Sequence, residues 1–106
     1  MSVTKVNDSN FIAEVINSDR PVLVDFSATW CGPCQRLAPT IHEVAEEFAA
    51  QVKVCEVDVD EAPGLVQQFR IMSVPTLVVM RDGQEKDRMV GGQSKEQILA
   101  ALHLAK

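Results

Sequence analysis

Two cysteines separated by two residues have the clearest chemical capacity in this sequence. They are Cys31 and Cys34, within a Trp-Cys-Gly-Pro-Cys run. Thiols at this spacing can close a small disulfide ring and reopen it with little movement of the backbone. The pair can therefore carry two electrons reversibly by thiol–disulfide exchange.

The position of the pair makes its two thiols different. A strand pattern ends near Ser27, and apolar residues then recur at helical spacing over 34–48. A thiol at a helix N-terminus lies beside unpaired N–H groups and the positive end of the helix dipole, which favour its thiolate. We therefore expect Cys31 to be the nucleophile. We expect Cys34, on the apolar helix face, to be more buried and to resolve the mixed disulfide.

Metal binding is the main alternative for such a pair. A zinc site needs two more ligands, and the remaining candidates, Cys55, His42 and His103, are not at metal-ligand spacing. An iron–sulfur cluster needs more thiolates, and a structural disulfide across so short a loop adds little stability. We therefore expect no metal and no cofactor, with Cys55 a buried apolar residue and both histidines in solvent.

Length and composition bound the class of protein. The chain has 106 residues, 46% of them hydrophobic and 24% charged, which predicts a single globular domain over 1–106. Ten Lys and Arg are dispersed among fifteen Asp and Glu, and this disfavours nucleic-acid binding. The longest mostly apolar stretch, 74–80, is too short to cross a membrane, and the first twenty residues lack a signal pattern. We expect a cytoplasmic protein or one in an equivalent reducing compartment.

The surrounding pattern predicts the elements that hold the dithiol. Strands are expected at 22–26, 52–59, 76–80 and 86–90, and helices at 11–16, 34–48, 60–69 and from Ser94 onward. An Asp82-Gly83 turn joins the last two strands as a hairpin, and Ser94 with Gln97 forms a capping box. Alternating elements followed by a hairpin predict an α/β fold, with a central mixed sheet of about five strands and about four flanking helices.

A carboxylate stands inside one of the predicted core strands. Asp25 lies between apolar neighbours, so its charge must be paired, hydrogen-bonded or removed by a raised pKa. A raised pKa suits a proton shuttle, whereas a satisfied structural carboxylate is the alternative.

The whole chain resembles the thioredoxin family. The matching motifs are Trp30-Cys31-Gly32-Pro33-Cys34, Val24-Asp25-Phe26, Pro39, Val74-Pro75-Thr76, and Asp82-Gly83 with Gly91. The resemblance implies a thioredoxin fold and a general protein dithiol–disulfide oxidoreductase that reduces partner disulfides. It implies two kinds of partner, a thioredoxin reductase that is NADPH- or ferredoxin-linked and disulfide-containing client proteins. We expect a monomer.

The resemblance also implies roles for further residues. Asp25 would lie below the dithiol and assist deprotonation of Cys34. Pro75 would be cis and pack against the dithiol, with the Val74 backbone pairing to an extended substrate. The docking surface would be flat and apolar, formed by Trp30, Gly32, Pro33, Val74, Pro75, Gly91 and Gly92.

Three departures from the family bear on the chemistry. Gln35 replaces a common Lys, Ser27 replaces a common Trp, and Glu56 replaces a Lys that many members carry close to the buried carboxylate. If Glu56 faces Asp25, two acids replace an ion pair. We then predict that Asp25 titrates higher than an ordinary Asp.

Two other functions stay open at this point. The first is a binding module of the same fold, in which the dithiol is incidental. The second is an oxidase or isomerase, a role that belongs to oxidising compartments. Intact Cys31, Cys34 and Pro75 favour the reductase.

Overall fold

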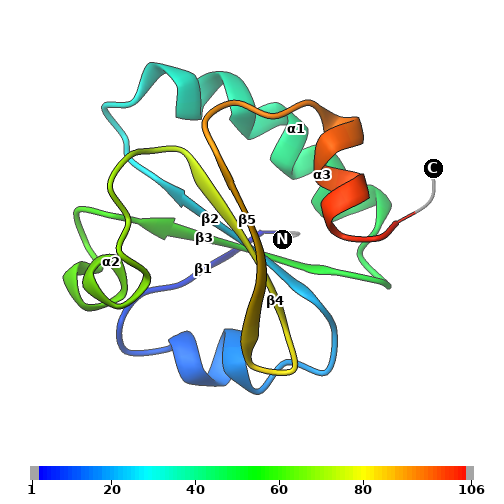
Figure 1. The fold of residues 1–106 in the computed structure, drawn as a ribbon, viewed down its shortest axis with the longest axis horizontal. Coiled ribbons are helices and arrows are strands. Elements are labelled where there is room, and N and C mark those ends of the chain that lie inside the picture. The colour runs from blue at the N-terminus through cyan, green and yellow to red at the C-terminus, as the bar shows by residue number, and fades with distance from the viewer. Residues whose placement is uncertain (1–2, 105–106) are drawn as a thin grey trace.

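The elements follow the predicted order along the chain. The computed structural model describes residues 3–104 (Figure 1). Its elements are β1 (Val3–Lys5), η1 (Ile12–Ile16), β2 (Val22–Ser27), α1 (Gly32–Glu47), β3 (Lys53–Asp58), α2 (Pro63–Phe69), β4 (Thr76–Arg81), β5 (Gln84–Val90) and α3 (Lys95–Ala101). The predicted fold class is confirmed, and the predicted element boundaries shift by only a few residues.

The five strands form one mixed sheet in the order β1-β3-β2-β4-β5. β1, β3 and β2 run parallel, whereas β4 pairs antiparallel with β2 and β5 pairs antiparallel with β4. β2 is central, and all six of its residues are buried. The dithiol follows directly after this strand, so it lies at the carboxyl edge of the sheet.

Helices cover both faces of the sheet (Figure 1). α1 and α3 pack on one face, where Leu37, Ile41 and Ile98 meet Leu23 of β2. η1 and α2 pack on the other face, in a cluster that includes Phe11, Val15, Leu65, Phe69 and Phe26. Because side chains alternate along a strand, each strand supplies residues to both cores.

Local sequence signals explain where the helices begin. Cys31 is the N-cap of α1, and Pro33 lies in its first turn, where a missing N–H costs nothing. In α3 the Ser94 hydroxyl accepts from the Gln97 N–H at 3.1 Å, and the Gln97 side chain accepts from the Ser94 N–H at 2.8 Å. The predicted capping box is therefore confirmed.

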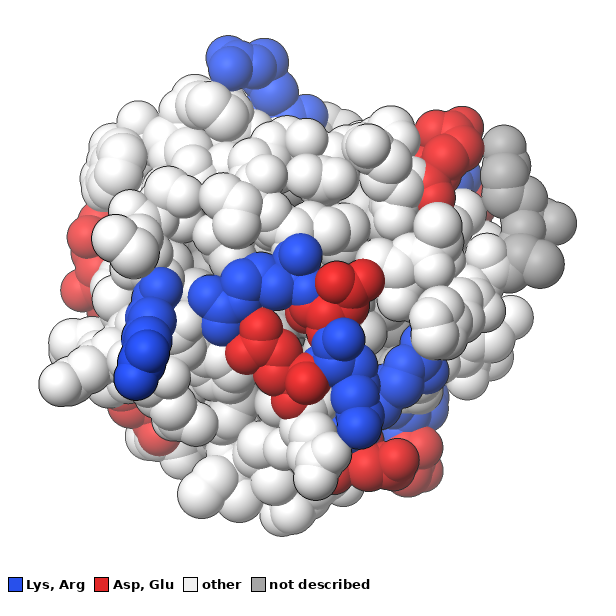
Figure 2. Space-filling model, viewed as in Figure 1, with Lys and Arg blue, Asp and Glu red and all other residues white. Residues whose placement is uncertain are grey.

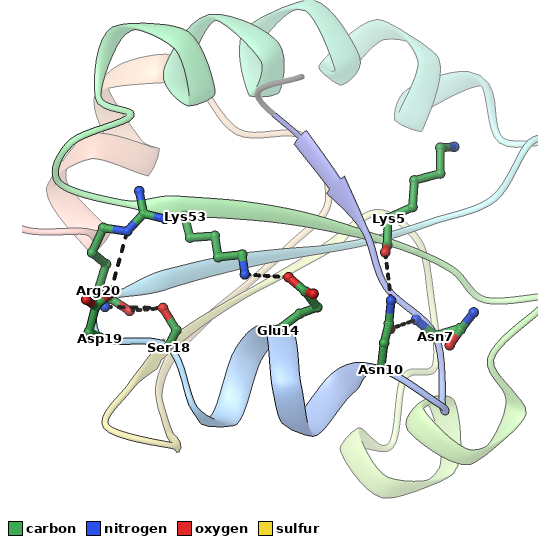
Figure 3. A network of polar contacts seen from close by, with 8 residues as sticks. All are labelled: Lys5, Asn7, Asn10, Glu14, Ser18, Asp19, Arg20 and Lys53. Carbon is green, nitrogen blue, oxygen red and sulfur yellow. Dashed lines mark hydrogen bonds and ion pairs between the residues drawn. The ribbon is translucent and has the colours of Figure 1, made fainter.

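Polar contacts attach the N-terminal segment to the sheet edge (Figure 3). The Asn7 N–H donates to Asn10 Oδ1 at 2.8 Å, and Asn10 Nδ2 donates to the Lys5 carbonyl at 3.2 Å. Glu14 of η1 forms an ion pair with Lys53, the first residue of β3, at 2.6 Å. These contacts hold η1 against the apolar face that it covers.

Charged side chains are unevenly distributed over the surface. In Figure 2 most of them gather in the middle and lower right of the view, and isolated charged side chains lie at the top and left edges. The exposed edge strand β5 carries charges of both signs, including an Arg88–Glu85 ion pair at 2.7 Å, and such charges protect an edge from further strand pairing. Within residues 3–104 no helix has the length and apolar character needed to cross a membrane.

Candidate active site at the start of helix α1

Cys31 and Cys34 are joined by a disulfide at the N-terminus of α1. Their Cα atoms are 5.2 Å apart, an ordinary separation for a disulfide, so the spacing closes the ring as predicted. The Cys34 N–H also donates to Cys31 Sγ at 3.1 Å. A donor at this position stabilises negative charge on Cys31 when the bond opens, in addition to the helix dipole.

The expected difference in burial between the two cysteines is wrong. Cys31 is 4% exposed and Cys34 is 7% exposed, so Cys34 is not the more buried of the two. The Val74 carbonyl oxygen lies 3.7 Å from Cys31 Sγ and helps to cover it. Cys34, in contrast, lines a pocket of about 380 Å³ behind the helix start, and Cys31 does not. Tertiary packing thus leaves a pocket beside Cys34 that helical periodicity cannot reveal.

The loop before β4 supplies the neighbour of Cys31. The Val74–Pro75 peptide bond is cis, as expected from the resemblance. Val74 is half-buried, whereas Pro75 is buried and supports the surface from beneath rather than forming part of it. The Gly91 N–H donates to the Pro75 carbonyl at 2.9 Å. Val74, Pro75 and Gly91 are therefore brought together beside the dithiol.

The expected docking residues lie around two hollows rather than on one flat patch. Trp30, which is 69% exposed as predicted, lines a hollow of about 270 Å³ together with Val74 and Met72. Pro33 and Gly92 line a separate hollow of about 350 Å³. Gly32 is half-buried between them in chain order, at the first position of α1. The indole N–H of Trp30 donates to Asp60 at 2.8 Å, which fixes the ring orientation.

Met72 is a surface residue that the sequence reasoning missed. It is 95% exposed and lines the hollow beside Trp30. An unbranched thioether adapts to varied partner surfaces. The available signal was a large apolar residue between Ile71 and Ser73, three positions before Pro75.

Asp25 and Glu56 are direct neighbours in the sheet. They are register partners on the parallel strands β2 and β3, so their side chains point to the same face. Asp25 is 5% exposed, and among residues 3–104 its Oδ1 atom has no hydrogen-bond partner. Burial first, and the charge of Glu56 second, raise the pKa of Asp25 to about 7. The predicted facing of the two acids and the raised pKa are both confirmed, and the unpartnered oxygen disfavours a satisfied structural role.

Glu56 connects the buried acid to the surface. Its side chain is 32% exposed and lies 3.4 Å from the Lys5 ammonium. The Ser27 hydroxyl donates to its other oxygen at 3.4 Å. Ser27, Cys34 and Glu56 all line the pocket behind the helix start. A small residue at position 27 leaves this space open.

The residues that we expected to be inert lie away from the site. Cys55 is fully buried on the opposite face of β3, and burial raises its pKa to about 11, so its thiolate is scarce. His42 and His103 are exposed, as predicted. In the described part of the chain, no three His, Cys, Asp or Glu residues gather to hold a metal ion.

Comparisons with known proteins point to one family. The sequence profile of the Thioredoxin family matches residues 2–104. The chain is 45% identical to a thioredoxin of Mycobacterium bovis over 98 residues, which cover 92% of this chain and 84% of the relative. It is 48% identical to thioredoxin 1 of Synechococcus elongatus over 90 residues, 85% and 84% of the two chains. It is also 43% identical over 98 residues, 92% of this chain, to 21% of the bifunctional thioredoxin reductase/thioredoxin of Mycobacterium leprae.

Proposed function

The chain belongs to the thioredoxin family and is a dithiol–disulfide oxidoreductase, and from this premise we propose the role of each residue in reducing client proteins. Cys31 is the nucleophile, Cys34 resolves the mixed disulfide, and Asp25 exchanges the proton. The observation that carries this assignment is the Cys34 N–H directed at Cys31 Sγ at the start of α1.

The first step consumes the Cys31 thiolate. Its sulfur attacks one sulfur of the client disulfide, a new bond forms between Cys31 and the client, and the second client sulfur leaves as a thiolate. The helix N-terminus and the Cys34 N–H at 3.1 Å favour the ionised form of Cys31 before the attack. The leaving client thiolate takes a proton from solvent.

The second step releases the client. The Cys34 thiol passes its proton to the Asp25 carboxylate, and the Cys34 thiolate attacks Cys31 Sγ. The bond between Cys31 and the client breaks, the client leaves with two more electrons than its disulfide had, and the internal disulfide forms. An acid with a pKa of about 7 can both accept and release a proton near neutral pH, which supports Asp25 in this role.

Clients dock on the surface around the dithiol. The Val74 backbone beside Cys31 pairs with an extended client segment, and Trp30 provides apolar contact area. Gly32, Pro33, Gly91 and Gly92 complete the surface, with Pro75 beneath it. Backbone pairing depends little on the side chains of the client, which supports docking of clients that differ in sequence.

A separate thioredoxin reductase, NADPH- or ferredoxin-linked, recharges the disulfide in this proposal. The Mycobacterium leprae relative is a single chain that is named as both a thioredoxin reductase and a thioredoxin. We place the protein as a monomer, a single domain over 1–106, in the cytoplasm or an equivalent reducing compartment. A reducing compartment suits a dithiol whose task is to donate electrons.

Reduction of insulin by dithiothreitol, followed as turbidity, tests the assignment. We expect the wild type and Cys55→Ala to accelerate precipitation and Cys31→Ser to lose the effect. Cys34→Ser should accumulate a mixed disulfide with insulin, which mass spectrometry detects at Cys31. If wild type and Cys31→Ser behave alike, the dithiol is incidental and the binding-module alternative is correct.

A further inference from the structure

The pocket behind the dithiol is the feature that this mechanism leaves unused. Its volume is about 380 Å³, and it lies where the start of α1 passes over the ends of β1, β2 and β3. Ser27 and Glu56 contribute from the sheet, and Cys34 contributes from the helix. The space thus connects the resolving cysteine, the strand that carries Asp25, and the solvent.

Each catalytic cycle leaves a proton on Asp25 that has to be removed before the next cycle. The carboxyl group takes a proton from Cys34, yet the residue is 5% exposed and its Oδ1 atom has no partner among residues 3–104. To act again, it must pass that proton to water. A buried acid without a route would exchange slowly, so the neighbours of Asp25 decide how the proton leaves.

The sheet offers Asp25 one polar neighbour in register. On β4 its partner is Leu77, which is fully buried and carries no proton-accepting group. On β3 its partner is Glu56. From α1 the ionisable group at this end is Cys34, and from β1 it is Lys5, which pairs with Glu56 at 3.4 Å.

We propose that Glu56 is the positioning and relay group that carries protons between Asp25 and the solvent of this pocket. The inference rests on the proposed role of Asp25. In the relay, protonated Asp25 gives its proton to the Glu56 carboxylate, Asp25 becomes a carboxylate again, and Glu56 releases the proton to water. No electrons move in this step, and the two acids simply exchange one proton.

The contacts of Glu56 suit a relay. It is the register partner of the buried acid, its side chain is 32% exposed, and it lines the pocket. Ser27 Oγ at 3.4 Å and Lys5 Nζ at 3.4 Å each engage one of its oxygens and hold the carboxylate at the pocket. A carboxylate at position 56 thus gives Asp25 a neighbour with oxygens that can take and return a proton, which a Lys ammonium cannot offer.

The chain provides a matched control in Asp58. It lies two residues further along β3 on the same face and lines the same pocket, but its register partner is Ser27 rather than Asp25. Removing its charge alters the pocket potential without removing the neighbour of Asp25. Glu56→Gln and Asp58→Asn therefore separate a relay from a general charge effect.

A pH jump on a preformed mixed disulfide tests the relay. A small thiol is attached to Cys31 at a pH below the Asp25 pKa of about 7, the pH is raised above it, and release of the thiol is timed by acid quench and mass spectrometry. In dilute buffer we expect Glu56→Gln to release the thiol about tenfold more slowly than wild type. Added acetate supplies a carboxylate from solution and should restore the rate of Glu56→Gln while it leaves wild type and Asp58→Asn unchanged.

Two outcomes would overturn the relay. One is a Glu56→Gln rate equal to that of wild type. The other is a slow Glu56→Gln rate that does not respond to acetate, because Glu56 then acts only through its charge. The proposed function fails separately, since in that case wild type itself would not release the thiol from Cys31.

Discussion

The two faces of the sheet are built from the same strands but differ in character. On the face under η1 and α2, Val22, Val24 and Phe26 of β2 meet further apolar residues of β3, and the cluster is apolar throughout. On the face under α1, β2 begins with Leu23 and then presents Asp25 and Ser27 toward its carboxyl end. The first face contributes stability alone, whereas the second gives up stability at one edge to gain a chemical site.

Parallel pairing explains why the polar residues gather at one edge. Asp25 pairs in register with Glu56, and Ser27 pairs with Asp58, so both strands become polar at the same level. The start of α1 brings Cys34 to that level. Polar residues that alternate along two strands thereby become one contiguous site. The difference between the two faces of the sheet can be tested by substitutions on each face.

The largest expected effect comes from the apolar face. Phe26 is fully buried and packs against Phe69 with ring centroids 5.5 Å apart. Phe26→Ala should lower the free energy of unfolding by about 3–5 kcal/mol, because it removes apolar contact and leaves a cavity. Urea unfolding measures this. Ile12→Ala, at a residue that is 66% exposed, should change stability by less than about 0.5 kcal/mol, and a similar loss in both variants would contradict the comparison.

Asp25→Asn should instead raise the free energy of unfolding. The folded-state pKa of about 7 lies above the ordinary value of 3.8, so the folded state binds more protons than the unfolded state between these values. Stability therefore falls as pH rises from about 4 to 7, and above pH 7 the full cost is roughly 4 kcal/mol. The Asn variant should be more stable by up to that amount at alkaline pH and little changed in acid.

Urea unfolding at an acidic and an alkaline pH checks this difference. The same variant should reduce insulin more slowly, because Cys34 has lost its proton acceptor. Parallel stability profiles for wild type and Asp25→Asn would show that the buried carboxyl does not titrate as described.

A smaller effect on stability is expected from a substitution of Cys55, which lies next to Glu56 in β3 but on the other face of the sheet. Cys55→Ser places a hydroxyl among apolar neighbours and should cost about 1–3 kcal/mol. Insulin reduction by the folded protein should be unchanged, since the residue is remote from the dithiol chemistry. A loss of activity larger than the loss of folded protein would mean that the apolar face takes part in function.

The smallest expected effect is on the titration of Asp25 itself. Glu56→Gln should lower the Asp25 pKa, because it removes the like charge, but less than burial raises it, since burial is the larger cause. Carboxyl NMR titration measures the change, with Asp58→Asn as the comparison. An Asp25 pKa that is identical in Glu56→Gln and wild type would show that the two acids do not interact.

Local signals in the sequence were sufficient to predict the helices, the strands and the hairpin turn. Asp82 and Gly83 both have positive φ, 54° and 77°, as a two-residue hairpin turn between β4 and β5 requires. The Ser94 and Gln97 capping box began α3 where expected. Strong periodicity and turn chemistry act over a few residues, so the chain reveals them without its fold.

The site was only partly visible in the sequence. The Cys31 and Cys34 pair was evident from spacing, and the pairing of Asp25 with Glu56 was foreseen only on condition that the two strands were neighbours in that register. The relative burial of the cysteines was predicted wrongly, and Met72 and the pocket beside Cys34 were missed. These features depend on which segments meet in space.

By itself the sequence determined the dithiol, its place at a helix start, and the order of strands and helices, because these depend on neighbours along the chain. Only the tertiary structure decided that the Val74 carbonyl covers Cys31, that Glu56 is the polar neighbour of Asp25, and that a pocket reaches Cys34. Each of these joins segments far apart in the sequence, and their alignment follows from strand order, register and the packing of α1 on the sheet.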